Sequence, residues 1–229
     1  MEYEATFIES VERNYNTKSF RFTRAPDFEY SAGQFFYLTL DKNKVKHFSF
    51  SESPTQKGFV EFTTRLTGSE YKNAVNRLKP GDKVRINGPN GEYTYKEDYK
   101  KIAFLSGGIG ITAIRSICKY LGEEKPGTDV VFLYQNEQEK DILFREDFNA
   151  LTKKNNNMKI VHILKEPPDK WSGPTGEIDK TIVAKNIPDY AERMFYISGP
   201  PAMVLSLITV LVELGVDKKR IKMENFVGY

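Results

Sequence analysis

Two glycine-containing turns in the C-terminal half of the chain have the residue types that bind nucleotides. One lies in Gly108-Ile-Gly-Ile-Thr-Ala113, which fits G-x-G-x-x-G/A between an apolar run and a helical pattern. Glycine lets backbone N–H groups approach a pyrophosphate, and the helix start adds positive potential. The other turn, Ser198-Gly-Pro-Pro201, also follows an apolar run and opens a helix. The first turn predicts a dinucleotide site, with a purely structural glycine turn as the alternative. The contacts expected there are Gly108, Ile109, Gly110, Ile111 and Thr112.

Residues after the next apolar run are expected to meet the ribose of that dinucleotide. Asn136 and Glu137 stand in Tyr134-Gln-Asn-Glu-Gln138, near where an acidic residue usually binds the ribose hydroxyls, and a solvated loop is the alternative. No arginine follows directly to bind a 2′-phosphate, so NADH is favoured over NADPH. The chain has no Tyr-x-x-x-Lys, which argues against a short-chain alcohol dehydrogenase. We therefore expect a bound cofactor to carry the reaction.

Composition excludes several other classes of function. The 229 residues are 39% hydrophobic and 13% aromatic, enough for buried cores, and the net charge of +3 argues against nucleic acid as a partner. A single cysteine rules out an intrachain disulfide or a four-cysteine cluster, and two histidines cannot supply a metal site alone, so no metal is expected. No apolar run is long enough to span a membrane, and the N-terminus lacks a signal-peptide pattern. A cytoplasmic protein is expected.

The two halves of the chain differ in the spacing of their apolar segments. Each half is expected to position some of the candidate binding residues. Residues 1–98 hold short β-rich runs between turns and one helix, which predicts an antiparallel β-barrel. Residues 99–229 alternate apolar strands with helical patterns, which predicts a parallel Rossmann-like α/β sheet. The expected strands are Ala5–Glu12, Ser19–Thr23, Gln34–Leu40, His47–Ser51, Phe59–Arg65 and Lys83–Gly88, then Ile102–Ser106, Val130–Tyr134, Lys159–Leu164, Met194–Ser198 and Arg220–Met223.

Five short motifs follow one another along almost the whole chain. They are Ala32-Gly-Gln-Phe35, Lys46-His-Phe-Ser-Phe-Ser51, Gly107-Gly-Ile-Gly-Ile-Thr112, Ser198-Gly-Pro-Pro201 and Glu224-Asn-Phe-Val-Gly-Tyr229. In this order they resemble the ferredoxin–NADP reductase family in its compact form, with one flavin domain and one nicotinamide domain. The resemblance implies an NAD(P)H-dependent flavoprotein reductase that contains FAD. The chain departs from the family's usual arginine at Lys46, which keeps the charge but loses the bidentate contact with the FAD diphosphate.

The resemblance implies that the first domain binds FAD. Ser49 would hydrogen-bond near the reactive edge of the flavin, and Phe48 would pack against the ring or its ribityl arm. A core position in an alternating strand is the alternative for Phe48 and Phe50. The helix after Ser69 would offer N–H groups to the diphosphate, and an ordinary N-cap is the alternative for Ser69. The implied FAD contacts are Lys46, His47, Phe48, Ser49, Phe50, Thr64, Arg65, Ser69, Tyr71, Lys72 and Asn73.

The resemblance also implies where the nicotinamide lies. It would lie near Ser198, Gly199, Pro200 and Pro201, and Glu224 would lie near the nicotinamide or the flavin edge. Tyr229 would stack on the flavin, and a frayed chain end is its alternative. The implied catalytic residues are Ser49, Ser198, Glu224 and Tyr229.

The resemblance implies that electrons leave the flavin for a separate acceptor, either a protein such as a ferredoxin, flavodoxin or oxygenase component, or a small molecule. Two alternatives stay open. One is a flavin or ferric reductase that treats flavin as a dissociable substrate. The other is an electron-transfer subunit that works only inside a larger complex.

Overall fold

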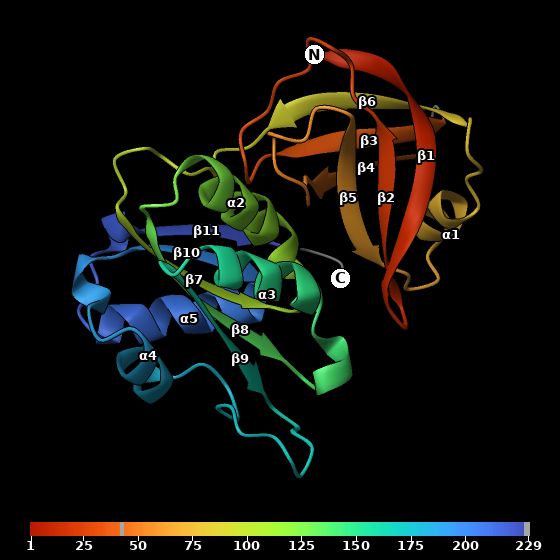
Figure 1. Cartoon of the computed structure of the whole chain (residues 1–229). Coiled ribbons are helices and arrows are strands. Elements are labelled where there is room, and N and C mark those ends of the chain that lie inside the picture. Colours follow the sequence, from red (N-terminus) through yellow and green to blue (C-terminus); the bar gives the residue numbers. More distant parts are fainter. Residues whose placement is uncertain (42–43, 227–229) are drawn as a thin grey trace. The chain divides into compact units, whose positions relative to one another are not determined.

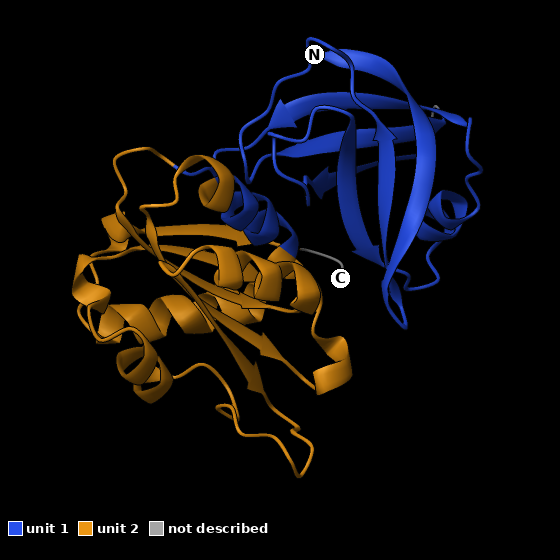
Figure 2. Cartoon of the chain, viewed as in Figure 1, with its two compact units in different colours: residues 1–95, 112–120 blue, residues 96–111, 121–229 orange. Residues whose placement is uncertain are grey.

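The computed structural model describes residues 1–41 and 44–226, which form two compact units (Figure 2). The first unit holds residues 1–95 and 112–120, and the second holds residues 96–111 and 121–229. The division expected from the sequence at residue 98 places all of helix α2 (Ile111–Glu124) in the second domain. In the structure, residues 112–120 of α2 pack with the first unit.

The first unit is built on a six-stranded antiparallel sheet in the order β4-β3-β6-β1-β2-β5 (Figure 1). Phenylalanines alternate along its strands, so that one face fills a core that includes Phe20, Phe36 and Phe62. The strands are β1 (Glu2–Asn14), β2 (Thr17–Thr23), β3 (Phe35–Asp41), β4 (Lys44–Ser49), β5 (Phe59–Arg65) and β6 (Lys83–Asn90), and a short helix α1 (Glu70–Asn76) lies between β5 and β6.

The two edge strands of this sheet approach each other and close it into a barrel. Phe48 of β4 stacks on Phe62 of β5 with ring centroids 4.1 Å apart. Just beyond β4, the N–H of Ser51 donates to the carbonyl oxygen of Glu61 at 2.8 Å. The antiparallel β-barrel predicted for the N-terminal half is therefore confirmed.

The second unit is a five-stranded parallel sheet in the order β11-β10-β7-β8-β9 with helices on both faces (Figure 1). In β8, Phe132 meets Phe148 of α3 on one face, while Leu133 joins the core formed with α4 and α5 on the other. This confirms the predicted α/β domain. Its strands are β7 (Lys101–Gly107), β8 (Asp129–Asn136), β9 (Met158–Leu164), β10 (Met194–Gly199) and β11 (Ile221–Asn225), and its remaining helices are α3 (Arg145–Lys154), α4 (Lys180–Asn186) and α5 (Pro201–Glu213).

The strand register brings several polar side chains to one edge of this sheet. Ser198 of β10 pairs with Glu224 of β11 on one side and with Ser106 of β7 on the other, and Ser106 pairs with Tyr134 of β8. The strand order reverses between β7 and β10, and open α/β sheets bind ligands beside the carboxyl ends of the strands at such a point.

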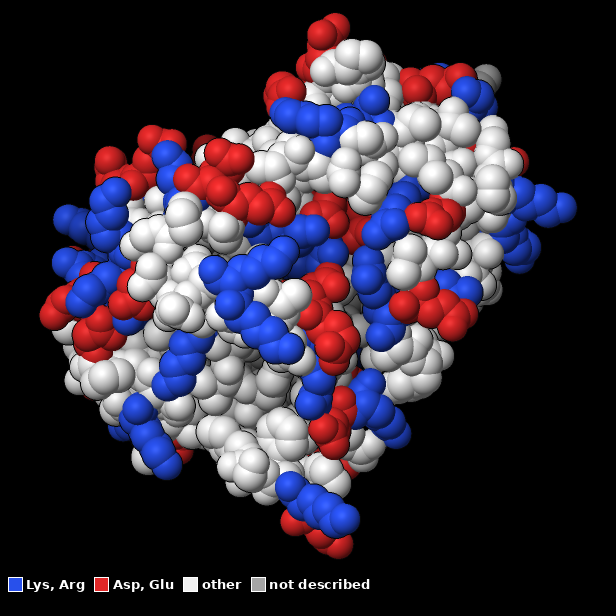
Figure 3. All heavy atoms as spheres, viewed as in Figure 1, with Lys and Arg blue, Asp and Glu red and all other residues white. Residues whose placement is uncertain are grey.

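The surface carries charges of both signs. On the face seen in Figure 3, basic and acidic side chains are interspersed, so this face presents no large patch of one sign. Among the described residues, no helix is both long and apolar enough to cross a bilayer.

Candidate functional site

The glycine turn after β7 is held tightly against the end of β10. Gly108–Gly110 form a single 3-10 turn that leads into α2, and Gly108 adopts a φ of 55°, which favours glycine. A Cβ on Gly110 would lie 2.6 Å from the carbonyl oxygen of Ser198, so a larger residue cannot fit without a backbone shift. The structure thus explains both glycines by backbone geometry, Gly108 by its positive φ and Gly110 by the close approach of β10.

Two buried hydroxyl groups hold the carbonyl oxygens of this turn. Tyr134 Oη donates to Gly108 O at 2.9 Å, and Ser198 Oγ donates to Gly110 O at 2.8 Å. Ser198 is fully buried, so in this structure its hydroxyl contacts the turn. The residues at the turn and the start of α2 are also buried, namely Ile109, Gly110, Ile111 and Thr112, whereas Gly108 is half-buried.

The start of α5 and the end of β11 complete this edge of the sheet. Pro200 caps α5 and Pro201 is its first residue, and both are exposed. The N–H of Phe226 donates to Gly199 O at 3.0 Å, which keeps the segment after β11 beside the Ser198–Pro201 turn. Tyr229 lies outside the described residues.

Glu224 is a half-buried residue beside this turn. Its Oε2 atom is buried and has no hydrogen-bond partner among the described residues. Burial raises the pKa of Glu224 to about 7, because the charged carboxylate is poorly solvated. A buried polar atom without a partner is costly, so this carboxyl suits a ligand that can hydrogen-bond to it.

The end of β8 supplies a second polar group without a partner. Both amide atoms of Asn136 are buried and make no hydrogen bond to the described part of the chain. The exposed Glu137 follows it, with Oε2 3.5 Å from Lys165 Nζ, and Glu177 also pairs with Lys165 at 3.4 Å. An amide that can donate and accept fits the hydroxyls of a ribose.

In the first unit, three basic residues come together from three elements. Lys46 lies on β4, Arg65 on β5 and Lys72 on α1. The pKa of Lys72 is lowered first by burial and then by the positive charges of Arg65 and Lys46. Among the described residues, neither Lys46 nor Arg65 has a carboxylate within ion-pair distance. Because mutual repulsion is relieved by an anion, this group of cations fits the diphosphate of FAD.

The remaining residues of the motif at positions 46–51, the flavin motif, lie on β4 and directly after it. Phe48 and Phe50 point into the barrel core, where Phe50 stacks on Tyr30 at 3.9 Å, as the alternative interpretation of both residues predicted. His47 is exposed and lies 5.4 Å from the ring of Phe35. Ser49 is largely buried and makes no side-chain hydrogen bond within the described residues.

At the start of α1 the backbone N–H groups of Lys72 and Asn73 already have partners within the chain. Ser69 is the N-cap, and its Oγ accepts from Lys72 N at 3.4 Å, while its carbonyl accepts from Asn73 N at 2.9 Å. The alternative interpretation of Ser69 as an ordinary N-cap is therefore the one the structure has. Tyr71 is buried and donates its hydroxyl to Leu38 O at 2.7 Å, so it supports β3. Thr64 is also fully buried.

A buried ion cluster in the first unit was not predicted from the sequence. Glu61 is fully buried and accepts from Arg13 and Arg21 through Oε2, at 3.1 and 2.9 Å, and from Arg115 of α2 through Oε1 at 3.0 Å. Arg115 also donates to the carbonyl oxygen of Ser51, two residues after Ser49. Arg115 interrupts the apolar face of α2, and that single charge was the signal available in the sequence.

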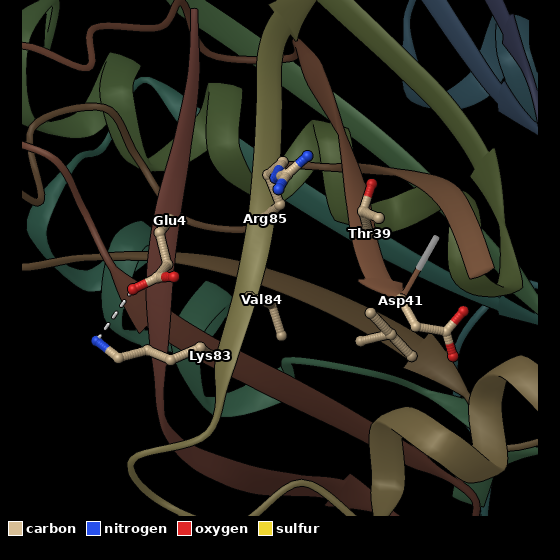
Figure 4. A pocket seen from close by; sticks show the side chains of 7 residues that line it. Glu4, Thr39, Asp41, Lys83, Val84 and Arg85 are labelled. Atoms are coloured by element: carbon tan, nitrogen blue, oxygen red, sulfur yellow. Dashed lines mark ion pairs between the residues drawn. The ribbon is translucent and has the colours of Figure 1, made fainter. Parts of the chain in front are cut away.

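A separate hollow of about 290 Å³ lies on the barrel surface, between β1, β3 and β6 (Figure 4). Lys83 and Glu4, which line it, are 3.6 Å apart in an ion pair, and Arg85 pairs with Glu2 at 3.1 Å. None of the residues predicted for the site lines this hollow. Since its charges are paired and exposed, we assign it no role in binding FAD or the nicotinamide.

Comparison with known proteins matches the two parts of the chain to two oxidoreductase domain families. Residues 4–95 match the family described as "Oxidoreductase FAD-binding domain", and residues 104–207 match the "Oxidoreductase NAD-binding domain". The chain is 30% identical over 205 residues to a subunit of the Na(+)-translocating NADH-quinone reductase of Idiomarina loihiensis, an alignment that covers 82% of this chain and 50% of the relative. The chain therefore spans about half the length of the curated relatives that it matches.

Solved structures share the complete two-unit fold. The ferredoxin reductase in carbazole 1,9a-dioxygenase has a TM-score of 0.86 at 21% identity and covers 99% of this chain and 69% of its own. A ferredoxin NADP+ reductase from Neisseria gonorrhoeae with bound FAD and NADP has a TM-score of 0.83 at 18% identity and covers 98% of both chains. The chain thus belongs to the oxidoreductases that join an FAD-binding domain to an NAD-binding domain, and it has the two-domain fold of ferredoxin–NADP reductase-like proteins.

Proposed function

We propose that this protein is an FAD-dependent reductase that takes electrons from NADH and passes them to a separate acceptor. The observation that carries the proposal is the row of residues at the switch point of the parallel sheet. There Glu224, whose Oε2 atom has no hydrogen-bond partner in the described part of the chain, lies opposite Ser198 in the strand register, and Ser198 holds the glycine turn at Gly110. FAD, when bound, accepts a hydride from a reduced nicotinamide and can release the electrons singly or in pairs.

The residues of this chain would bind and orient the two cofactors. Lys46, Arg65 and Lys72 would neutralise the FAD diphosphate, and Ser49 would offer a hydroxyl to the flavin. Tight positioning matters because transfer between two cofactors depends on close and aligned reacting atoms. Glu224, with a pKa of about 7, would hold a proton on its carboxyl below neutral pH and release it above neutral pH.

Charge at the end of β8 supports NADH as the preferred donor. Lys165 is the cation nearest to Glu137 for which an ion pair is seen, and it is shared with Glu177. Arg145 is paired with Glu139 at 3.0 Å. Because both of these cations already pair with carboxylates, a 2′-phosphate would meet charges of its own sign at Glu137 and Glu177, whereas a 2′-hydroxyl could bind Asn136.

The lengths of the relatives support a second candidate. The curated relatives are subunits of an NADH-quinone reductase and are about twice as long as the aligned region. This chain could therefore act as an electron-transfer component whose acceptor is another subunit. An autonomous reductase would still turn over with ferricyanide, whereas a dependent subunit would accept electrons from NADH and then stall.

Gel filtration followed by steady-state assays tests the proposal. We expect the protein to elute with bound FAD. We also expect it to reduce ferricyanide with a kcat/KM for NADH at least about tenfold above that for NADPH, because a tenfold ratio corresponds to the free energy of about one hydrogen bond. Elution without flavin, with activity restored only by added flavin, would favour a reductase that uses flavin as a substrate. Equal or better use of NADPH would contradict the preference for NADH.

A further inference from the structure

Tyr134 is a tyrosine of the central sheet whose hydroxyl reaches the glycine turn. The side chain is fully buried on β8, and its ring packs beside Phe132 at 5.4 Å and His162 at 6.0 Å. These contacts fix the ring, and the hydroxyl then donates to Gly108 O at 2.9 Å. The tyrosine therefore connects the rigid centre of the sheet to the first residue of the turn.

A second hydroxyl holds the other end of the same turn. Ser198 donates to Gly110 O, and it comes from β10, whereas Tyr134 comes from β8. These two strands are the neighbours of β7 on its two sides. The glycine turn that follows β7 is thus held from both neighbouring strands, one hydroxyl for each end.

The hydrogen bond from Tyr134 compensates for the conformational freedom of glycine. Gly108 has a φ of 55°, and glycine can leave this region for many other conformations at little cost. The peptide group is planar and trans, so holding the carbonyl of Gly108 also fixes the direction of the following N–H group. Loss of the hydroxyl would let this peptide rotate, although the packing of the ring would stay the same.

We infer that Tyr134 is a positioning residue for the dinucleotide, acting through Gly108 and touching neither cofactor. The inference rests on the proposed function, because it assumes that the glycine turn binds the diphosphate of NADH. The proposed role of Tyr134 is in binding NADH and not in the transfer step. The hydroxyl should therefore affect the KM for NADH and leave kcat unchanged.

The variant Tyr134→Phe removes the hydroxyl and keeps the ring. We expect the KM for NADH to rise about three- to tenfold, as for the loss of one hydrogen bond, with kcat and the flavin spectrum unchanged. Tyr30→Phe is a matched control, because Tyr30 is also buried and donates its hydroxyl to a backbone carbonyl, that of Glu52, at 3.0 Å. The control should lose comparable stability and keep the wild-type KM. An unchanged KM in Tyr134→Phe, or an equal rise in the control, would overturn the inference.

Binding of ADP-ribose gives a readout that does not depend on turnover. ADP-ribose contains the diphosphate and lacks the nicotinamide, so calorimetry on the FAD-loaded protein should show a Kd raised by the same factor in Tyr134→Phe. Equal Kd values for the variant and the wild type would contradict the role of Tyr134. If the wild type binds ADP-ribose but does not oxidise NADH, the proposed function fails, and the comparison of Kd values still decides the inference.

Discussion

Arg115 and Glu61 form a buried ion pair in which Nη1 and Oε1 are 3.0 Å apart and the two side chains are 3% and 0% exposed. The Glu61 carboxylate also forms ion pairs with Arg13 and Arg21, so three guanidinium groups surround it. Burial by itself would raise the pKa of Glu61, but the positive charges of Arg115, Arg13 and Arg21 outweigh it and lower the pKa. The cluster thus keeps a fully buried carboxylate ionised next to the end of the flavin motif.

Glu61→Gln should destabilise the protein by about 3 kcal/mol at pH 7, because it leaves buried guanidinium groups without their counter-charge. A carboxyl whose pKa is lowered in the folded state stabilises that state above its unfolded pKa of about 4.3, and this contribution is lost as the pH falls. Urea unfolding at pH 7 and pH 3 should therefore show a smaller acid effect in the variant than in the wild type. Glu9→Gln, which breaks an exposed pair with Arg21, serves as the control and should cost less than about 1 kcal/mol. An equal acid effect in wild type and Glu61→Gln would contradict this account.

Gly110→Ala should weaken NADH binding at least about tenfold, because the new Cβ would lie 2.6 Å from Ser198 O and would push the turn out of place. The KM for NADH measures the effect. Gly127→Ala is a suitable control, since no atom lies within 4 Å of a Cβ built there. A normal KM in Gly110→Ala would show that the turn does not bind the coenzyme.

Lys46→Ala should raise the Kd for FAD about tenfold, as expected for loss of a charged contact with the diphosphate. Flavin fluorescence after dialysis at two salt concentrations measures the change, and Lys46→Arg should retain FAD at least as well as the wild type. Lys57→Ala, which removes an exposed lysine paired with Glu29, is the control. Equal FAD retention in Lys46→Ala would place the diphosphate away from β4.

Glu224→Gln should alter the pH dependence of stability in the opposite direction from Glu61→Gln. The pKa of Glu224 is raised to about 7 in the folded protein, so the folded state binds a proton that the unfolded state releases near pH 4.5. The wild type should therefore lose about 2 kcal/mol of stability between pH 5 and pH 8 through this group, and the variant should not. Glu213→Gln, an exposed carboxyl paired with Lys180, should behave like the wild type. Parallel stability curves for Glu224→Gln and wild type would refute the raised pKa.

Local patterns in the sequence predicted much of the fold. Alternating apolar residues indicated the barrel strands, and an unbroken apolar run before Gly108 indicated a buried parallel strand followed by a helix. The motif order also placed Ser198 and Glu224 in one site, and the register of β10 and β11 brings these residues opposite each other.

Contacts between residues far apart in the sequence could not be predicted in the same way. Arg115 meets Glu61 across 54 positions, and Tyr134 meets Gly108 across 26. These contacts depend on the curvature of the barrel and on the strand order, which a periodic pattern does not specify. Strand alternation did offer the core position of Phe48 as an alternative, but its stacking partner Phe62 comes from the opposite edge strand and follows only from barrel closure.

An anaerobic titration of the purified protein with NADH, followed by visible absorption, tests the central claim most directly. The account predicts a flavin spectrum that survives desalting and is bleached by about one equivalent of NADH for each bound flavin, because FAD takes up one hydride. A flavin spectrum that neither NADH nor NADPH bleaches would contradict the claim that this chain transfers electrons from a nicotinamide to FAD.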